Sequence, residues 1–377
     1  MDATLPVIVN VAAGKGCTTE DLDAIRDAFR SAGREADILP ARNGAEIESL
    51  ARRAVGQEHP LIVAAGVGNN DYMMDGFSVG THGDAPRPPD PARRPEGDRA
   101  PARGEEELVR VIAHLSDLHF GRVENALLEP MRRCVQALEP HLVVVSGDLT
   151  QRARPRQFGE ARRYLDSLPQ PQIVVPGNHD VPLYNVFQRF ATPLDKYRRF
   201  ISENLEPDYF DDEIAVVGIN TVRSFSWKEG RINARQVERA RSKLCGRPGH
   251  VAKIIVTHHP FDVPGDRDEN QIVRRAAMAM KVFARCGADI LLSGHLHTTC
   301  TTHSAERYRI PGHSALIVQA GSATSTRLRG ESNSFNALHV TPDEIRVDRY
   351  TWVPQKSEFL LAGSERFCRA PDGWHRR

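Results

Sequence analysis

The sequence lacks the features of membrane-spanning proteins and of disulfide-stabilised secreted proteins. No apolar run approaches the roughly 18 residues that a membrane helix needs, and Asp2 stands where a signal peptide carries basic residues. The six cysteines are scattered and form no CxxC pair, so no disulfide framework is expected. We therefore expect a cytoplasmic protein in a reducing compartment.

The chain also lacks a surplus of charge of either sign. It has 50 basic and 49 acidic residues and a net charge of +1. Bulk electrostatics gives no support to binding of nucleic acid or of a membrane surface, so neither partner is expected. What is present is a globular composition, with 40% apolar and 26% charged residues, and a length of 377 residues that indicates two or three domains.

One compositional break divides the chain. The stretch from Gly83 to Gly104 has six prolines, many charges and no large apolar side chain, so it cannot bury enough surface to offset its ordering entropy. We expect a linker there. The expected parts are an N-terminal piece (1–82), the linker (83–106), a large domain (107–355) and a C-terminal tail (356–377).

The N-terminal piece alternates strand and helix patterns. The strand-like runs are PVIVN, EADILP and PLIVAAG, and the helical segments between them are TTEDLDAIRDAFRSAG and AEIESLARRAV. This β-α-β-α-β order predicts a small parallel sheet. It is half of a typical domain, and an uncovered sheet edge could pair with a partner, so a homo-oligomer stays open.

The large domain has nine strand-like apolar runs with helical patterns between several of them. Such an order predicts an α/β domain with two sheets and helices outside. The runs are Val109–Leu115, Leu142–Ser146, Gln172–Pro176, Glu213–Ile219, Lys253–Thr257, Asp289–Leu292, Ala315–Gln319, Phe335–Val340 and Ile345–Tyr350.

Five of these strands are followed at once by polar side chains of the kind that bind metals. In open α/β sheets, sites form outside the carboxyl ends of the strands, and glycine lets the backbone turn sharply there. Residues at i and i+2 of an extended chain point the same way, so Asp117/His119 and His295/His297 can each converge. A lone DxH or HxH is near chance, whereas the ordered set is not. The five segments read SDLHF, SGDLT, PGNHD, THHP and SGHLH.

These five segments resemble the motifs of the calcineurin-like metallophosphoesterases. The resemblance spans about Val109 to Tyr350 and is marked for the bacterial branch with cyclic-nucleotide and glycerophosphodiester hydrolases. It implies a β-sandwich flanked by helices, with a dinuclear metal centre. Imidazole and oxygen ligands together suit Fe, Mn or Zn. The resemblance assigns Asp117, His119 and His297 to one metal, Asn178, His258 and His295 to the other, and Asp148 to both.

The same resemblance implies a hydrolase for a small anionic phosphoester. Two divalent ions leave the site positive, and a bridging hydroxide would attack phosphorus in line. His179 is the candidate general acid for the leaving alkoxide, and Asp180 would orient it, or alternatively serve as a turn or cap residue. His259 and Arg327 are candidate substrate contacts, with a packing histidine and a surface-loop arginine as alternatives. His114, inside a strand, is expected in the core.

The N-terminal piece carries a second resemblance. PVIVNVAAGKG and LIVAAGVGN resemble the first half of a diacylglycerol-kinase-type catalytic domain. The phosphate-binding turn GGDGT of that family reads Ala65-Gly66-Val67-Gly68-Asn69 here, and the rest of the kinase domain is absent. This implies a partial, degenerate accessory segment without lipid kinase activity, although the GKG loop could cradle a phosphate.

The leading hypothesis is a metal-dependent phosphodiesterase acting on a cyclic nucleotide or a glycerophosphodiester. A phosphomonoesterase or a nuclease on the same centre is the nearest alternative, because loops and not ligand spacing set specificity. A regulatory binding protein without turnover is a third reading. The complete ligand set and His179 argue against it.

Overall fold

The structure is a computed structural model of the 377-residue chain. It describes residues 4–11, 22–23, 26–27, 29–30, 35–43, 46, 49–50, 53, 63–66 and 109–377, apart from 183–188, 190–191, 224–228, 266–268 and 327–329. The chain forms two compact units, Met1–Glu107 and Leu108–Arg377.

Unit 1 contains a three-stranded parallel sheet in the order β2-β1-β3. The strands are β1 (Leu5–Asn10), β2 (Ala36–Ala41) and β3 (Val63–Gly66), with Val7 paired to both Ile38 and Val63. Described residues between the strands, such as Leu22 and Leu50, are helical. The small parallel sheet predicted from the sequence is confirmed. The GKG loop and the turn after Gly66 lie outside the described residues.

Unit 2 contains two sheets, one of seven strands and one of six. The strands that follow one another with helices between them are parallel, and antiparallel strands flank them in both sheets. In order, the seven-stranded sheet is β16 (Gly373–Arg376), β15 (Glu358–Ala370), β14 (Glu344–Val353), β13 (Ser334–Val340), β4 (Arg110–Leu115), β5 (Leu142–Val145) and β6 (Gln172–Val174). The six-stranded sheet is β11 (Cys300–His303), β12 (Leu316–Gln319), β10 (Ile290–Ser293), β9 (Ala252–Val256), β8 (Ile214–Gly218) and β7 (Asp208–Phe210).

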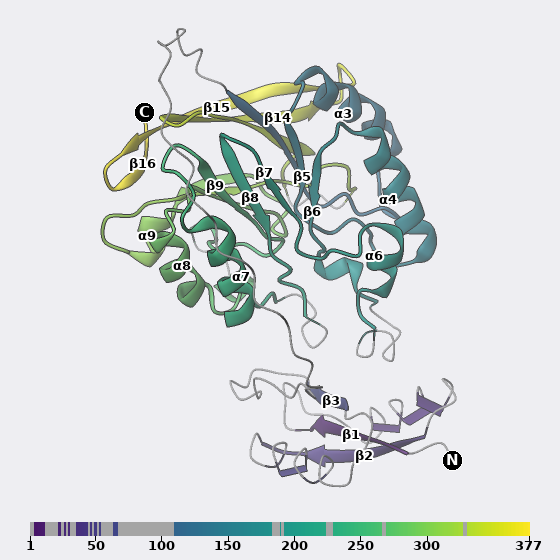
Figure 1. Ribbon diagram of the computed structural model, residues 1–377. Helices are drawn as coiled ribbons and strands as arrows, with labels where there is room; N and C mark the ends of the chain where they lie inside the picture. Colours follow the sequence, from purple (N-terminus) through teal and green to yellow (C-terminus); the bar gives the residue numbers. More distant parts are fainter. Residues whose placement is uncertain are drawn as a thin grey trace, which may run out of the picture. The chain divides into compact units, whose positions relative to one another are not determined.

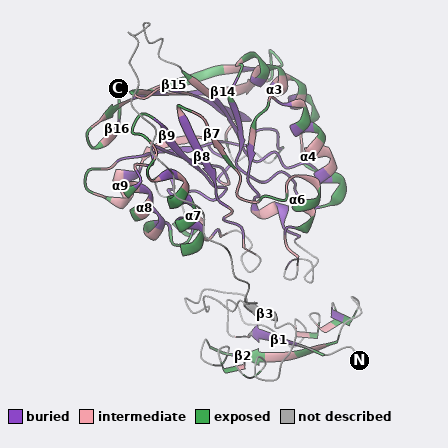
Figure 2. Cartoon of the chain, viewed as in Figure 1, coloured by how far each residue is buried: buried purple, intermediate pink, exposed green. Residues whose placement is uncertain are grey.

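The two sheets pack face to face as a sandwich. Strand side chains alternate between faces, so Ile112 of β4 enters the core between the sheets while Ala113 turns outward toward the helices. The inner core joins residues of both sheets, among them Val144 of β5 and Ile254 of β9. Strands β8 and β9 are buried over their whole length, whereas β15 is partly exposed (Figure 2). The predicted β-sandwich of two sheets is confirmed.

Helices cover both outer faces of the sandwich. Helices α3 (Asn125–Ala137), α4 (Pro155–Ser167) and α6 (Asp195–Phe200) lie on one side, and α7 (Ala234–Leu244), α8 (Ala276–Arg285) and α9 (Ser304–Tyr308) lie on the other (Figure 1). Helix α4 begins at a proline, whose missing N–H suits a first helical position. It buries Phe158, Ala161 and Leu165, which recur at the spacing of one helical face.

The C-terminal residues are not the tail expected at 356–377. They form β15 and β16, which extend the seven-stranded sheet. Trp374 anchors them, because it is buried and its Nε1 donates to Asp289 Oδ1 across 2.9 Å. A hairpin with a buried anchor is part of the domain.

The expectation of no disulfide is also wrong. Cys245, after α7, and Cys286, after α8, are joined by a disulfide. Both lie where these two adjacent helices end, with 4.5 Å between their Cα atoms. The expected reducing compartment rested on the absence of such a bond and loses that support. Among the described residues, no helix has the length and apolar character needed to cross a membrane.

Candidate metal centre

Five strand-end loops of unit 2 meet at one place, as the sequence pattern predicted. Parallel strands end at the same edge of a sheet, so β4, β5 and β6 deliver three loops and β9 and β10 deliver two more. Main-chain hydrogen bonds join neighbouring loops. Asp117 N donates to Gly147 O across 3.1 Å, and Gly294 N donates to His258 O across 3.1 Å.

Five of the predicted metal ligands have left-handed backbone. The expected conformation was extended chain, in which alternate residues point the same way. Instead, each of these residues curls its loop with a positive φ, a conformation that costs a non-glycine residue free energy and is concentrated at functional sites. The residues are Asp117 (φ 53°), His119 (φ 52°), Asp148 (φ 53°), His295 (φ 73°) and His297 (φ 59°).

Two glycines allow the loops to approach one another closely. A Cβ on Gly177 would lie 2.2 Å from both N and Oδ1 of Asp148, and a Cβ on Gly294 would lie 1.7 Å from Ser116 Oγ. No side chain fits at such distances, because it would displace the main chain and carboxylate of Asp148, or the buried Ser116 hydroxyl that donates to Asp117. The glycines of PGNHD and SGHLH therefore serve close packing of the loops.

The first predicted ligand set is assembled and fully enclosed. Asp117 Oδ1 lies 3.4 Å from His119 Nε2 and 3.6 Å from His297 Nε2. Asp117 and His119 are completely buried. Asp117 Oδ1 and both ring nitrogens of His119 make no hydrogen bond with any residue that the structure describes. Buried polar atoms normally have partners, and a metal ion would satisfy these.

The second predicted ligand set lies beside the first. His258 Nε2 lies 3.1 Å from Asn178 Oδ1 and 3.3 Å from His295 Nδ1. His258 Nδ1 donates to Ser146 O across 2.8 Å, which leaves the lone pair of the other ring nitrogen for a metal. The three side chains can thus present two imidazoles and one amide oxygen to a single ion.

Asp148 lies between the two sets. Its Oδ2 is 3.4 Å from His258 Nε2 and 3.7 Å from His119 Nε2. Its ligand atom can group with His119 or with Asp117 and His258, within 4.8 Å in each case. A carboxylate with neighbours on both sides can be shared by two ions. The donor set therefore fits two metal ions.

The electrostatics keep both aspartates ionised. Burial acts to raise the pKa of Asp117, but His297 and His119 hold it below its usual value. The pKa of Asp148 is likewise lowered well below its usual value against the effect of burial, chiefly by His258. Anionic carboxylates are the form that binds a cation.

The imidazoles respond to the same charges. Burial acts to lower the pKa of His258, but Asp148 raises it to about 9. Burial and the neighbouring His258 lower the pKa of His295 to about 3. A metal ion bound at His258 would replace the proton on its ring.

His179 lies at the rim of the centre and is half-buried. Its ring stands edge-on to His119 with 4.9 Å between centroids. Its Nδ1 lies 3.0 Å from the carbonyl oxygen of Gln151 and 3.4 Å from Gln151 Nε2. Because a carbonyl only accepts, Nδ1 carries the proton in that bond. Gln151, which the sequence reasoning missed, thus orients the ring.

Asp180 makes the contacts of the turn or cap alternative, because its carboxylate binds main-chain N–H groups. Its completely buried carboxylate accepts from the main-chain N–H of Gly177, Leu149 and Thr150, at 2.9, 3.2 and 2.9 Å, and from Thr150 Oγ1 at 3.0 Å. Burial and Asp148 raise its pKa to about 6, against these hydrogen bonds. It ties the loop after β5 to the loop after β6, and so acts on the backbone that carries His179.

Ser322 and Thr221 also support the candidate site, and neither residue was predicted from the sequence. Ser322 Oγ makes a short hydrogen bond with His297 Nδ1, and Thr221 Oγ1 lies 2.8 Å from His259 Nδ1. Ser322 follows Gly321 directly after β12, and a glycine after a strand is the signal that also marks the predicted ligand loops.

The remaining predicted residues take different positions. His259 is buried beside His258, whereas Arg327 lies outside the described residues. His114 is fully buried, as expected.

Two bacterial phosphodiesterases are similar in sequence to part of this chain. The 3',5'-cyclic adenosine monophosphate phosphodiesterase CpdA of Escherichia coli (strain K12) is 26% identical over 206 residues, which cover 51% of this chain and 70% of the relative. The glycerophosphodiester phosphodiesterase GpdQ of Enterobacter lignolyticus (strain SCF1) is 33% identical over 86 residues, which cover 19% of this chain and 29% of the relative.

Solved structures share the fold at low sequence identity. The purple acid phosphatase PPD1 from yellow lupin (Lupinus luteus) seeds aligns with a TM-score of 0.52 and 13% identity over 69% of this chain. The alignment spans about half of the lupin chain, 54%. PhoD aligns with a TM-score of 0.52 and 10% identity, over 73% of each chain. These likenesses show a common fold.

One protein family matches the segment that contains the motifs. The model of the family described as calcineurin-like phosphoesterase matches residues 110–299, which is half of the chain. That segment holds all five loops and every predicted metal ligand. The chain therefore belongs to the calcineurin-like phosphoesterase family.

Proposed function

We propose that the protein is a dinuclear-metal-dependent phosphodiesterase. The observation that carries the proposal is Asp148, whose carboxylate lies within 4 Å of one histidine from each ligand set. The names of the relatives CpdA and GpdQ support a diester of the cyclic-nucleotide or glycerophosphodiester type. The substrate would be a small anionic phosphoester.

Seven side chains would hold the metals. Two ions bound there would activate a water for in-line attack and neutralise charge on the phosphoryl oxygens. The mixture of imidazole, carboxylate and amide ligands favours Fe, Mn or Zn over Mg or Ca. The ligands would be Asp117, His119 and His297 at one position, Asn178, His258 and His295 at the other, and Asp148 at both.

His179 would supply the proton that the leaving alkoxide needs. Its Nδ1 donates to Gln151 O, so in the imidazolium form Nε2 carries a second proton that can be given away. A positioned general acid contributes about 10²- to 10⁴-fold to rate. Asp180 would support this step through the backbone, because it accepts from Gly177 N, one residue before Asn178.

A paired assay tests the proposal. Purified protein loaded with Mn(II) is assayed on bis-p-nitrophenyl phosphate and on p-nitrophenyl phosphate, beside Asp148→Ala, His179→Ala and the control His303→Ala, which changes a half-buried histidine on β11. We expect the diester to be preferred. Asp148→Ala should lose metal and activity, His179→Ala should lose activity and keep metal, and the control should match wild type.

Other outcomes replace the proposal by a stated alternative. A clear preference for the monoester makes the protein a phosphomonoesterase, and cleavage of single- or double-stranded DNA or RNA as the best substrate makes it a nuclease. Metal uptake without hydrolysis of any ester makes it a binding protein. No metal uptake at all removes the basis of the metal centre.

Two further parts stay predictions. Unit 1 is proposed to be a degenerate accessory segment of diacylglycerol-kinase type, and Arg327 is proposed to contact substrate. Both are checked by the same diester assay, on a variant lacking residues 1–107 and on Arg327→Gln. A cytoplasmic location is checked by cell fractionation.

A further inference from the structure

We infer that His259 is an additional metal ligand, a third imidazole for the ion held by His258 and His295. This inference rests on the proposed metal centre. In the sequence, His259 is only the residue after a ligand, and a substrate contact or a packing role fits it equally well. The structure favours neither of these.

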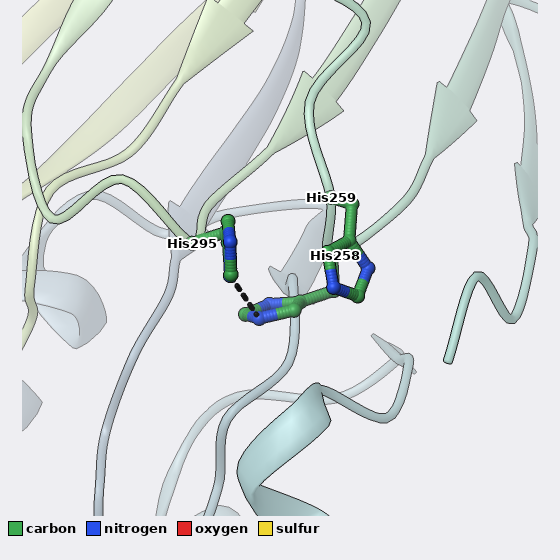
Figure 3. Close-up of side chains that lie close together, drawn as sticks. All are labelled: His258, His259 and His295. Atoms are coloured by element: carbon green, nitrogen blue, oxygen red, sulfur yellow. Dashed lines mark hydrogen bonds between the residues drawn. The ribbon is translucent and has the colours of Figure 1, made fainter. Parts of the chain in front are cut away.

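The three rings lie together. Figure 3 shows His259 beside His258 and His295. The centroid of its ring is 4.9 Å from that of His258 and 4.6 Å from that of His295. One nitrogen of each ring lies within 4.8 Å of the others. A single ion with Zn–N or similar bonds of about 2.1 Å can bring together nitrogens at such spacing with small ring shifts.

Thr221 holds the His259 ring from the other side. Its Oγ1 lies 2.8 Å from His259 Nδ1, and both residues are completely buried. In the tautomer that donates from Nδ1 to this hydroxyl, Nε2 carries the lone pair that binds metals. Ligating histidines almost always donate their other ring N–H in this way. His258 does the same toward Ser146 O.

The position of His259 is fixed more tightly than a packing role requires. A Cβ on Gly230 would lie 2.3 Å from His259 Cγ, so the main chain at Gly230 packs directly on the ring. Thr257 Oγ1 donates to the carbonyl oxygen of His259 across 2.8 Å. Side chain and main chain are thus both held. Such preorganisation is what a metal ligand needs.

A third imidazole makes the two metal positions unlike. The first has the Asp117 carboxylate and two imidazoles, whereas the second has Asn178 and, with His259, three imidazoles. Imidazole ligands suit Zn, Cu, Fe and Ni, whereas carboxylates suit Mg, Ca and Mn. The second position is therefore assigned to a divalent transition metal of the first kind, and His259 strengthens that choice.

Cobalt titration tests this role directly. Apo wild type, His259→Gln, Thr221→Val and the control His303→Gln are titrated with Co(II), following heat by calorimetry and the visible absorption of the bound ion. We expect two ions in wild type and control. In His259→Gln, one of the two binding steps should lose about 10- to 100-fold in affinity, namely the step in which Co(II) fills the second position. The visible spectrum of that ion should change. The affinity of the other step should stay as in wild type.

Thr221→Val keeps the ring and removes only its support. We expect a smaller loss in the same binding step, and this variant carries the test if His259→Gln does not fold. Unchanged affinities and spectra in both variants overturn the inference. Unchanged metal binding with a raised KM for bis-p-nitrophenyl phosphate makes His259 a substrate contact instead. If wild type binds no Co(II), the proposed metal centre fails, which is a separate result.

Discussion

The main-chain N–H of His179 donates a hydrogen bond to Oδ1 of Asp148 across 2.8 Å. The other carboxylate oxygen of Asp148 lies 3.4 Å from His258 Nε2. One side chain therefore fixes the loop that carries the candidate acid and lies between the two ligand sets. The proposed metal binding and proton transfer share this residue, and variants can separate the two tasks.

Asp148→Asn should abolish metal binding while preserving the loop. The amide oxygen can still accept from His179 N–H, but the negative charge that two cations would share is gone. We expect a loss of metal affinity of more than about 100-fold and an equal or larger loss of kcat/KM for bis-p-nitrophenyl phosphate. Metal content after dialysis and steady-state kinetics measure this. Asp166→Asn, an exposed site on α4, is the control, and full metal content in Asp148→Asn contradicts the prediction.

Asp180→Ala should destabilise the fold around the centre. The change leaves three buried main-chain N–H groups, of Gly177, Leu149 and Thr150, without their acceptor. Each such loss costs about 1–3 kcal/mol, so we expect the free energy of unfolding to fall by roughly 3 kcal/mol or more. Urea unfolding of the apo protein measures it. Thr150→Val removes a hydroxyl that donates to Asp180 and accepts from Ala153 N, so it should cost about 1–3 kcal/mol and less than Asp180→Ala.

Asp180→Ala also shows whether Asp180 supports the backbone or acts directly on the imidazole of His179. If Asp180 acts through the backbone, Asp180→Ala lowers stability and metal affinity together. A variant of unchanged stability and metal content that has lost only turnover would show instead that the carboxylate acts on the imidazole.

Gly177→Ala should disturb the centre through a single methyl group. Its Cβ would lie 2.2 Å from Asp148 N and Oδ1, so the loops must separate. Overpacking of this kind costs roughly 1–3 kcal/mol, and we expect weaker metal binding as well. Gly249→Ala is the matched control, because a Cβ there has no atom of a described residue within 4 Å. Thermal unfolding and Co(II) titration of both variants test the prediction. Equal behaviour of the two alanine variants would contradict it.

Much of the centre could be predicted because its signal is local. Each ligand directly follows an apolar run, and a parallel sheet brings such run ends to one edge. Asp117, Asp148 and His258 are predicted as ligands in this way, and their side chains lie together in the structure. The hydrogen bonds that orient the histidines could not be predicted, because their partners are far away in the sequence. Ser322 reaches His297, and Thr221 reaches His259 across 38 residues. No short motif records such pairs.

The C-terminal strands were missed for a different physical reason. β15 (Glu358–Ala370) buries Phe359 and Phe367 near its ends, but its middle residues are exposed. The alternation of apolar and polar residues that marks a half-buried strand is therefore weak. The strand forms because it pairs with β14 along its length, and its own sequence does not indicate this pairing.

Reduction of the disulfide should lower the stability of unit 2. Cys245 and Cys286 are 41 residues apart, and in the chain-entropy account a cross-link of that length stabilises the folded state by about 4 kcal/mol. We expect Cys245→Ser and reduced wild type to share the same lowered midpoint in urea. Cys368→Ser, at a free cysteine, should keep the wild-type midpoint. A free-thiol count matching six cysteines in native, unreduced protein contradicts the bond itself.

The buried His114 should make stability depend on pH. Burial lowers its pKa to about 3, with Asp117 opposing, and its Nε2 lies 2.9 Å from Ser146 Oγ. In the unfolded chain the pKa is about 6.5, so the unfolded state takes up a proton first as pH falls. The stabilisation is full above pH 6.5 and is lost progressively toward pH 3, by about 2 kcal/mol at pH 5. Urea unfolding at pH 7, 6 and 5 should therefore show a steeper decline for wild type than for His114→Gln, which does not titrate. Parallel declines would mean that His114 is protonated in the folded protein as readily as in the unfolded chain.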